Sequence, residues 1–303
     1  MKYEKIYNEL MNENIRYKNE EKDKEGMTER EFLNNYNPDE YDKPSVTTDM
    51  LVFTIDNGAL KLLLAKRNTH PFINQWCLPG GFVKMEETTE EAAKRILKQE
   101  TGLDNIYLEQ LYTNSNIDRD PRMRVISTSY IALTDKSNLN PVAGEEITEV
   151  AWFSVEKIIE KIDEDGTVYS VLEVKNDELN VSMKATVFDI PEKNGVVVSY
   201  KTKVIQTGND KLAFDHADVI NMGIERLRNK VEYTPIAFNL VDEYFTLPEL
   251  QSVYEIILGK KLYKTNFRRK IMPMVIEAES FVETSRRPAK LYTYNPLREI
   301  KER

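Results

Sequence analysis

The sequence predicts an α/β (α+β) protein in which a mixed-sheet sandwich is followed by a C-terminal winged helix-turn-helix domain. Apolar, β-branched runs separated by turn residues fill residues 46–154, and one strongly periodic helix interrupts them. After residue 215 the apolar repeat changes to helical spacing, and after residue 246 two short helices precede two strand-like runs. Strands with a covering helix predict the sandwich, and the last four elements have the order of a winged helix.

Composition limits the function classes. No apolar run approaches the ~18 residues that span a bilayer, so we expect no membrane partner. The N-terminus lacks the apolar segment of a secretory signal, and Cys77, the single cysteine, excludes an intrachain disulfide and a multi-cysteine zinc site. These features predict a cytoplasmic protein. The net charge of −9 argues against indiscriminate nucleic-acid binding by the whole chain.

The chain divides into four predicted parts. Residues 1–40 are predicted to be an N-terminal helical tail, because Tyr3, Ile6 and Leu10 share one helical face, although a partly ordered tail fits the polar composition equally well. Residues 41–215 form the sheet domain, with a hairpin turn at 56–58, a helix at 155–162 and a β insertion near 165–207 to which we assign a structural role. Residues 216–240 form a helix that links the domains or makes a dimer contact, and 241–296 form the winged helix.

The most informative stretch is GGFVKMEETTEEAAKRILKQETGL, residues 80–103. A strand is expected to end before it and to give way to a tight turn at its two glycines. Thr88 and Glu91 form a capping-box pair that begins a helix. Gly102 has the position of a C-cap glycine. The stretch therefore predicts a loop, a helix and a defined helix end.

This stretch resembles the signature of Nudix hydrolases, G-x5-E-x7-R-E-U-x-E-E-x-G-U with U apolar. The matching positions are Gly81, Glu87, Arg95, Leu97, Glu100, Gly102 and Leu103. Ile96 and Gln99 stand where the family has Glu. The resemblance implies the Nudix mixed-sheet sandwich over roughly residues 44–160. It also implies a family chemistry in which Mg²⁺ or Mn²⁺ assists cleavage of a nucleoside-linked diphosphate.

The two departures weaken the metal site. Hard cations take several oxygen ligands, and positions 96, 99 and 100 share one helix face. Glu100 is the only anion of the three, helped by Glu87, so we treat these two as weak metal ligands at most. We assign no catalytic residue and interpret Glu87, Arg95 and Glu100 as remnants. No cofactor is expected to be required, and Mg²⁺ or Mn²⁺ enters only if the chain is hydrolytic.

Arginines and glycines mark the ligand-binding candidates, which are Arg67, Gly80, Gly81, Arg119, Arg122 and Arg124. Arginine gives planar, bidentate contacts to phosphate, and glycine lets a ligand approach the backbone. The last three arginines come just before a strand that is expected to border the cleft. The alternative is a salt-bridged loop, in which Asp118 and Asp120 pair with the same arginines. His70 and His216 are predicted to be structural residues.

The C-terminal region carries a second group of candidates. Residues 260–291 hold nine Lys or Arg against three Glu, a local net charge of +6. A capping box at Thr246 and Glu249 begins the first helix, and the second helix is expected in the DNA major groove. The DNA-binding candidates are Lys264, Thr265, Asn266, Arg268, Arg269, Lys270, Arg286, Arg287 and Lys290. Asn266 is the candidate adenine reader, and a solvated basic helix is the alternative for any one position.

Together the two groups resemble the Nudix-related transcriptional regulators of the NrtR-like family. Segments that carry the resemblance include HPFINQWCLPGGFV, DRDPRMRVISTSYIAL, FTLPELQSVYEIILGKKLYKTNFRRKI and RRPAKLY. The resemblance implies a homodimeric, effector-responsive regulator. It would bind ADP-ribose or a related nucleotide or sugar phosphate in an impaired Nudix domain, and a double-stranded DNA operator through the winged helix. An active Mg- or Mn-dependent ADP-ribose hydrolase is the alternative, and a protein-interaction scaffold is a third possibility.

Overall fold

The computed structural model describes residues 21–102, 106–135, 147–282 and 289–297. The chain divides into two compact units, Met1–Pro44 and Ser45–Arg303. The first unit contains helix α3 (Glu29–Asn35) and the 3-10 turn η1 (Pro38–Glu40). A capping box at its amino end fixes the start of α3, and the helix buries none of its residues. The amphipathic face predicted between residues 3 and 11 lies outside the described residues.

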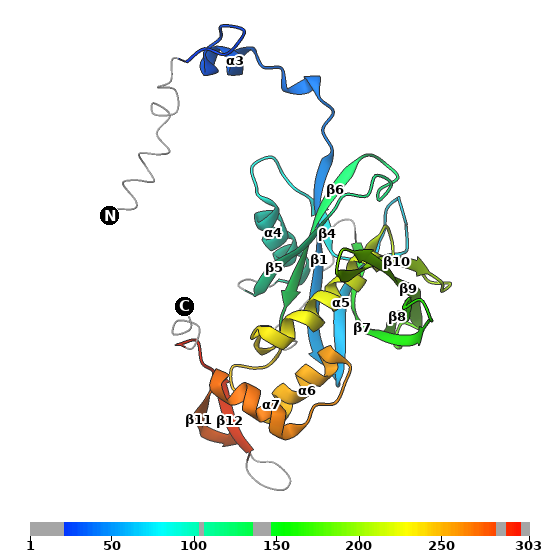
Figure 1. Ribbon diagram of the computed structural model, residues 1–303, viewed down its shortest axis with the longest axis vertical. Helices are drawn as coiled ribbons and strands as arrows, with labels where there is room; N and C mark the ends of the chain where they lie inside the picture. Colours follow the sequence, from blue (N-terminus) through cyan, green and yellow to red (C-terminus); the bar gives the residue numbers. More distant parts are fainter. Residues whose placement is uncertain (1–20, 103–105, 136–146, 283–288, 298–303) are drawn as a thin grey trace. The chain divides into compact units, whose positions relative to one another are not determined.

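A mixed sheet of ten strands, counted within the described residues, forms the body of the second unit (Figure 1). The strands are β1 (Ser45–Asp56), β2 (Ala59–Arg67), β3 (Trp76–Cys77), β4 (Gly80–Phe82), β5 (Tyr107–Asn114), β6 (Val125–Leu133), β7 (Ile147–Ile162), β8 (Val168–Asn176), β9 (Val181–Asn194) and β10 (Val197–Gln206). Their order is β10-β9-β8-β7-β2-β1-β6-β5, with β3 beside β2 and β4 beside β1. β1 and β6 are parallel, whereas β1 and β2 form the predicted hairpin, whose turn residues Asn57 and Gly58 both have positive φ.

Helices cover both faces of this sheet, as a sandwich requires. The helices are α4 (Thr89–Thr101) and α5 (His216–Tyr233). Alternate residues of a strand face opposite sides, so Met50 and Val52 of β1 pack in the cluster that includes α4, whereas Leu51 and Phe53 pack in the cluster that includes α5. Gly223 lets α5 approach closely, because a Cβ there would lie 2.4 Å from Cδ2 of Leu51.

Local sequence signals fix the ends of α4 as predicted. The Thr88 side chain accepts a hydrogen bond from the Glu91 amide, and the Glu91 carboxylate accepts one from the Thr88 amide. Gly102 ends the helix in the left-handed conformation, at φ 73°. Short-range signals therefore fix both the start and the end of α4.

One predicted helix is wrong. Residues 155–162 belong to β7, which pairs with β8 from Ser154 to Ile162. Pairing with a strand that follows in the sequence overrides the local helical pattern. Val155 and Lys157 point inward, and the Lys157 ammonium lies 3.0 Å from a carboxylate oxygen of Glu225 on α5. The three alternating runs after residue 165 form β8, β9 and β10, an antiparallel extension of the sheet, as predicted.

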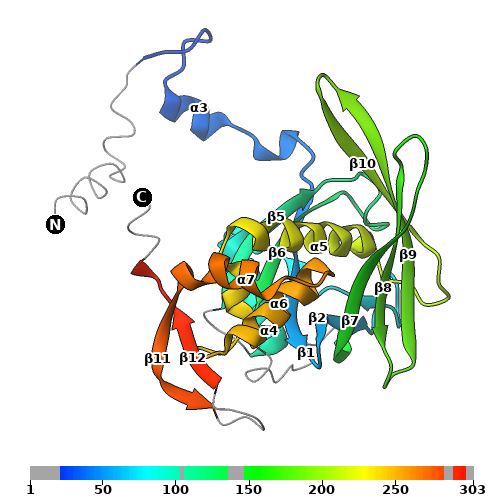
Figure 2. The ribbon, with the colours of Figure 1, turned by 60° about the horizontal axis from the view of Figure 1, so that its bottom comes forward.

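The C-terminal elements have the predicted winged-helix order (Figure 2). They are η3 (Ile236–Leu240), α6 (Leu247–Leu258), α7 (Lys264–Ile271), η4 (Met272–Met274), β11 (Val275–Val282) and β12 (Ala289–Tyr294). The predicted capping box of Thr246 and Glu249 begins α6, and Gly259 ends it in the left-handed conformation. β11 and β12 pair antiparallel as the wing.

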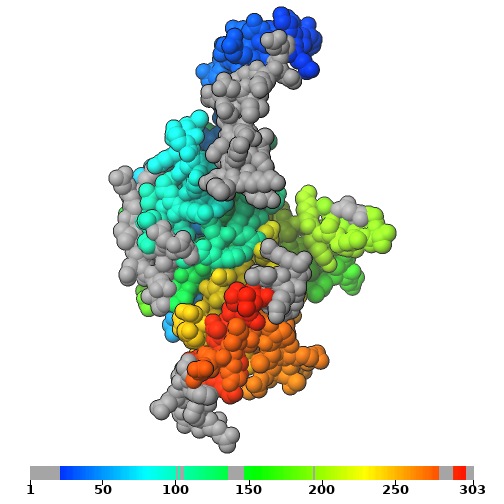
Figure 3. Space-filling view, turned by 90° about the vertical axis from the view of Figure 1, so that its left-hand side faces the viewer, coloured from blue at the N-terminus to red at the C-terminus, as the bar shows by residue number. Residues whose placement is uncertain are grey.

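The winged helix packs directly on the body of the second unit. Tyr254 of α6 and Phe267 and Ile271 of α7 belong to the same buried cluster as Leu227 and Val231 of α5. Figure 3 shows the surface of α5 (yellow) between the strands and the winged helix (orange and red). None of the helices in the described part of the chain is long and apolar enough to cross a membrane.

Candidate ligand pocket and nucleic-acid surface

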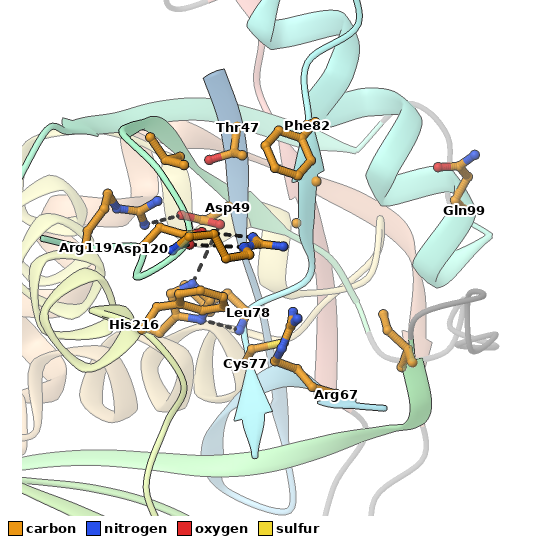
Figure 4. Close-up of a pocket in the computed structure, with 16 residues that line it drawn as sticks. Thr47, Asp49, Arg67, Cys77, Leu78, Phe82, Gln99, Arg119, Asp120 and His216 are labelled. Carbon is orange, nitrogen blue, oxygen red and sulfur yellow. Dashed lines mark hydrogen bonds and ion pairs between the residues drawn. The ribbon is translucent and has the colours of Figure 1, made fainter. Parts of the chain in front are cut away.

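A cavity of about 650 Å³ opens beside β1, β3 and β4. Its volume lies in the range of small-molecule sites. Figure 4 shows polar side chains such as Asp49, Arg119 and Asp120 on one side of it, and Leu78 and Cys77 nearby. Phe214 and His216, at the start of α5, also line it. The cavity therefore combines charged groups with apolar surface.

Arg119 is the centre of a buried ionic network in this cavity. Its Nη2 lies 3.0 Å from Oδ2 of Asp49 and 2.8 Å from Oδ1 of Asp215, and its Nε donates to Oδ2 of Asp215 at 3.0 Å. Ser127 donates its hydroxyl to Oδ2 of Asp49 at 2.6 Å. Burial opposes the charge of Arg119, but the hydrogen bonds and charges of Asp215 and Asp49 outweigh it, so the pKa of Arg119 is raised.

His216 connects the same network to the backbone. Its Nδ1 accepts a hydrogen bond from the Leu78 amide at 2.9 Å, and its Nε2 lies 3.7 Å from Oδ1 of Asp49. Burial lowers the pKa of His216 more than the Asp49 charge raises it, so the ring is neutral at pH 7. Because Nδ1 is an acceptor, the neutral ring carries its proton on Nε2, facing Asp49.

The other predicted arginines have different surroundings. Arg67 lines the cavity, with Nε 2.8 Å from the Pro71 carbonyl oxygen and its guanidinium over the Phe214 ring. Arg122 also lines it and forms an ion pair of 2.9 Å with Asp120. Arg124 does not line it, because its guanidinium donates to the backbone carbonyls of residues 115 and 116. The three clustered arginines therefore split into two that border the cavity and one that braces the preceding loop.

Gly80 and Gly81 lie in β4, not in the predicted tight turn, because they pair with β1. A Cβ on Gly80 would lie 2.6 Å from the Thr48 carbonyl oxygen, so glycine is needed there for the strands to approach. A Cβ on Gly81 would make ordinary contact with Ile96. Both glycines line the cavity, but the constraint on Gly80 comes from strand packing.

The described part of the Nudix-like box does not fit a divalent metal. Both carboxylate oxygens of Glu87 are held by Arg95, at 2.9 Å and 2.6 Å, and these hydrogen bonds lower the pKa of Glu87 to about 2. Ile96 is buried in the apolar cluster under α4, and the neutral Gln99 accepts a hydrogen bond from Arg95 at 3.2 Å. The side chain of Glu100 lies outside the described residues. The described side chains include no group of three or more His, Cys, Asp or Glu that could hold a metal ion.

The DNA-binding candidates gather on the exposed side of α7. Phe267 and Ile271 are buried, four residues apart, so the remaining positions of the helix face outward. The exposed candidates on this helix are Lys264, Thr265, Asn266, Arg268, Arg269 and Lys270. Tyr263, directly before the helix, was not among the predicted residues, although it is 83% exposed. The sequence signal for this residue is an aromatic side chain at the start of a helix, next to basic residues.

Two candidates have protein partners, and two are not described. The Lys270 ammonium donates to the Glu232 carbonyl at the end of α5, at 2.8 Å, and burial lowers its pKa. Lys290 on β12 forms an ion pair with Glu277 on β11. Arg286 and Arg287, predicted at the tip of the wing, lie outside the described residues. The described surface thus presents exposed positive charge at both ends of α7, on Lys264 in its first turn and on Arg268 and Arg269 in its last turn.

Sequence reasoning also missed the acidic partners in the cavity. Asp49 was not singled out, yet it interrupts the apolar strand VTTDMLVFTI, and a charge in such a strand is a signal of a buried partner. Asp215 occupies the N-cap position of α5, but its side chain makes no capping hydrogen bond and pairs with Arg119 instead.

The fold and site define a class of protein: a Nudix-type sheet with an arginine-lined cavity, joined to a winged helix. The NUDIX domain family matches residues 46–172, and the NrtR DNA-binding winged helix domain family matches residues 237–294. The chain is 32% identical to the ADPR responsive transcriptional repressor NtrR of Acinetobacter baylyi, over 88% of each chain. The chain belongs to the NrtR-like family of Nudix-related transcriptional regulators.

Solved structures agree with this membership. A MutT/nudix family protein from Enterococcus faecalis has a TM-score of 0.67 and 29% identity, with 89% of this chain and 94% of that chain covered. NrtR of Shewanella oneidensis, in complex with a 27mer DNA, has a TM-score of 0.59 and 28% identity, with 83% of this chain and 94% of that chain covered. The similarity therefore extends across both the sheet and the winged helix.

Proposed function

We propose that this protein is an effector-responsive transcriptional regulator that binds operator DNA through α7. The observation that carries the proposal is an arginine-lined cavity in the same compact unit as an exposed basic helix. The similarity over most of the chain to a repressor named as ADPR responsive supports it. The buried Ile96 and the paired Glu87 support binding over hydrolysis at the cavity.

The proposed effector is ADP-ribose or a related nucleotide or sugar phosphate. Arg67, Arg119 and Arg122 border the cavity and are the proposed phosphate ligands. One guanidinium group can donate two parallel hydrogen bonds to two oxygens of the same phosphate. The backbone of β4 at Gly81 offers a surface without a side chain. Phe214 supplies apolar area on which a base or sugar ring can rest. In this proposal Arg124 shapes the loop.

DNA binding is proposed at the exposed side of α7, which enters the major groove as a recognition helix. Lys264, Arg268 and Arg269 contact phosphates, and Asn266 contacts adenine. Lys290 is proposed to contact the neighbouring phosphates, a role that the sequence also predicts for Arg286 and Arg287. The proposal includes a homodimer, which matches a two-fold symmetric operator, and a cytoplasmic location.

The deciding experiment is a fluorescence-anisotropy titration of the protein on DNA from upstream of its own gene, with a scrambled fragment of equal length. We expect sequence-preferring, salt-sensitive binding that ADP-ribose changes by at least about 5-fold. Equal affinity for both fragments would contradict the proposal. A control variant, Lys201→Ala, removes one positive charge from the exposed strand β10, away from α7. Its DNA binding should equal that of wild type.

Hydrolysis is tested separately, with ADP-ribose and either Mg²⁺ or Mn²⁺. We expect turnover far below the enzyme range. A rate above about 1 s⁻¹ would instead identify a working hydrolase. The DNA-binding titration and the hydrolysis assay are independent, so together they show whether the protein is a regulator or a hydrolase.

A further inference from the structure

Helix α5 connects the cavity to the DNA-facing helix. Its first residue, His216, lines the cavity, and Asp215 directly before it holds Arg119. Its last turn lies against the winged helix, where α7 is anchored. A helix of 18 residues is about 27 Å long. One rigid element therefore has contacts at both proposed binding sites.

At the cavity end, the charge of Arg119 is shared between two carboxylates. The same Nη2 lies within 3.0 Å of both Asp49 and Asp215. Asp49 is held more firmly, because it lies within β1, also accepts the Ser127 hydroxyl and has a side chain only 9% exposed. The Asp215 side chain is 18% exposed and does not line the cavity. Asp215 accepts two hydrogen bonds from Arg119 and does not line the cavity, whereas Asp49 does, so an anion that draws Arg119 into the cavity would pull it away from Asp215.

At the far end, α5 is bonded to both helices of the helix-turn-helix. The Lys270 ammonium of α7 donates to the carbonyls of Glu232 and Val231, at 2.8 Å and 3.4 Å. Arg228 donates from Nε to the Ile257 carbonyl at the end of α6, at 3.2 Å. These contacts join α6 and α7 to the carboxyl-terminal half of α5. A shift of α5 would thus move the recognition helix.

The middle of α5 is close-packed on the sheet, which favours movement between discrete positions. The contact of Gly223 with Leu51 leaves no space for a Cβ, and the buried Lys157 ammonium holds Glu225. Close-packed helices slide by small, collective shifts that exchange one set of contacts for another.

We propose that the Arg119–Asp215 ion pair is the contact through which cavity occupancy changes DNA affinity. A bound phosphate takes the Arg119 guanidinium from Asp215 and frees the amino end of α5. The helix then shifts against the sheet and carries α7 with it through Lys270. Asp215 is thus a positioning residue that touches neither ligand. The inference rests on the proposed function and names how its two sites communicate.

The test is Asp215→Asn in the full chain, which removes the competing charge while Asp49 still neutralises Arg119. We expect Asp215→Asn to bind ADP-ribose at least as tightly as wild type and, without ADP-ribose, to bind the operator with the affinity that wild type has when ADP-ribose is bound. ADP-ribose should change its operator affinity less than 2-fold, against at least about 5-fold in wild type. Coupling is reciprocal, so the effect of DNA on calorimetric ADP-ribose affinity should fall by the same factor.

Glu225→Gln is the matched control, because it removes a paired carboxylate from the middle of the same helix, away from the cavity. It should retain wild-type coupling. Full coupling in Asp215→Asn would overturn the inference while leaving the proposed function intact, whereas an unresponsive wild type would overturn the proposed function itself. If Asp215→Asn fails to fold, Lys270→Gln tests the other end of α5. It should lose coupling with an unchanged salt slope, and retained coupling there would also overturn the inference.

Discussion

The cavity and the winged helix both present arginines, but the arginines are in opposite electrostatic states. In the cavity, the Arg119 side chain is 4% exposed and is neutralised by two carboxylates before any ligand arrives. On α7, Arg268 and Arg269 are exposed, and no ion pair within the described residues involves them. The first arrangement suits a specific ligand that must replace a protein carboxylate. The second suits a polyanion, whose bound counterions are released on contact.

The difference predicts different consequences of mutation in the two regions. Removing a buried, paired charge leaves its partners uncompensated and affects stability. Removing an exposed charge leaves the fold intact and affects binding and its salt dependence. Arginine-rich segments that look alike in the sequence therefore form two kinds of site, a buried ionic network and an exposed basic surface.

The largest effect is expected for Arg119→Ala. It leaves Asp49 and Asp215 facing each other in a buried site, so the free energy of unfolding should fall by about 3–5 kcal/mol. Urea unfolding followed by circular dichroism measures it. Arg122→Ala is the comparison, because its ion pair with Asp120 is partly exposed, and about 1 kcal/mol is expected. Equal losses in both variants would contradict the contrast between a buried network and a peripheral pair.

A second effect on stability concerns the degenerate box. Ile96→Glu places a carboxyl group in the apolar cluster of Met50, Val52 and Ala93, and should cost on the order of 3 kcal/mol of unfolding free energy. Gln99→Glu, at an exposed position on the same helix, should change it by less than about 0.5 kcal/mol.

The same two variants test the orientation of α4. Calorimetry with Mn²⁺ should show no gain in affinity for Gln99→Glu alone, because the neighbouring Glu87 is held by Arg95. A folded Ile96→Glu protein that gains Mn²⁺ affinity would show instead that position 96 can turn toward the cavity.

Short-range signals explain which parts of the fold could be predicted. The capping boxes at Thr88 and Thr246 and the glycine at 102 act within one helical turn, and all three fix helix ends as expected. The strand at 155–162 could not be found in this way. Its local pattern favours a helix, and only pairing with β8 selects the extended form.

The site was less predictable than the fold, because its partners are far apart in the sequence. Arg119 and Arg122 were predicted as ligand-binding residues from the composition of their loop, but Arg119 meets Asp215, 96 residues away, and Asp49, 70 residues away. Neither pairing leaves a local pattern. The same reasoning explains Lys270, which was grouped with its basic neighbours although its ammonium contacts the end of α5.

On the exposed side of the comparison, Arg268→Ala and Arg269→Ala should each weaken operator binding by about 1–2 kcal/mol and reduce the salt slope by about 1. Their unfolding free energies should stay within about 0.5 kcal/mol of wild type, since both side chains are exposed. Anisotropy titrations at several salt concentrations measure the slope. A loss of affinity with an unchanged slope would show a role other than phosphate contact.

The smallest expected effect is a pH dependence of stability caused by Asp218, in the first turn of α5. Burial and the charge of Asp215 raise the pKa of Asp218 to about 6, above its ordinary value of 3.8. Because the folded state holds this proton more tightly, its stabilising contribution is complete below pH 3.8 and is lost as the pH rises through about 6. Folding at pH 8 therefore requires two neighbouring carboxylates to be charged.

Asp218→Asn removes this penalty. Thermal unfolding should show stabilisation of the order of 1 kcal/mol at pH 8, a value reduced for partial exposure, and a much smaller difference at pH 5. Asp177→Asn, on an exposed turn, is the control and should behave alike at both pH values. If Asp218→Asn and wild type differ equally at pH 5 and pH 8, the carboxyl does not titrate in this interval.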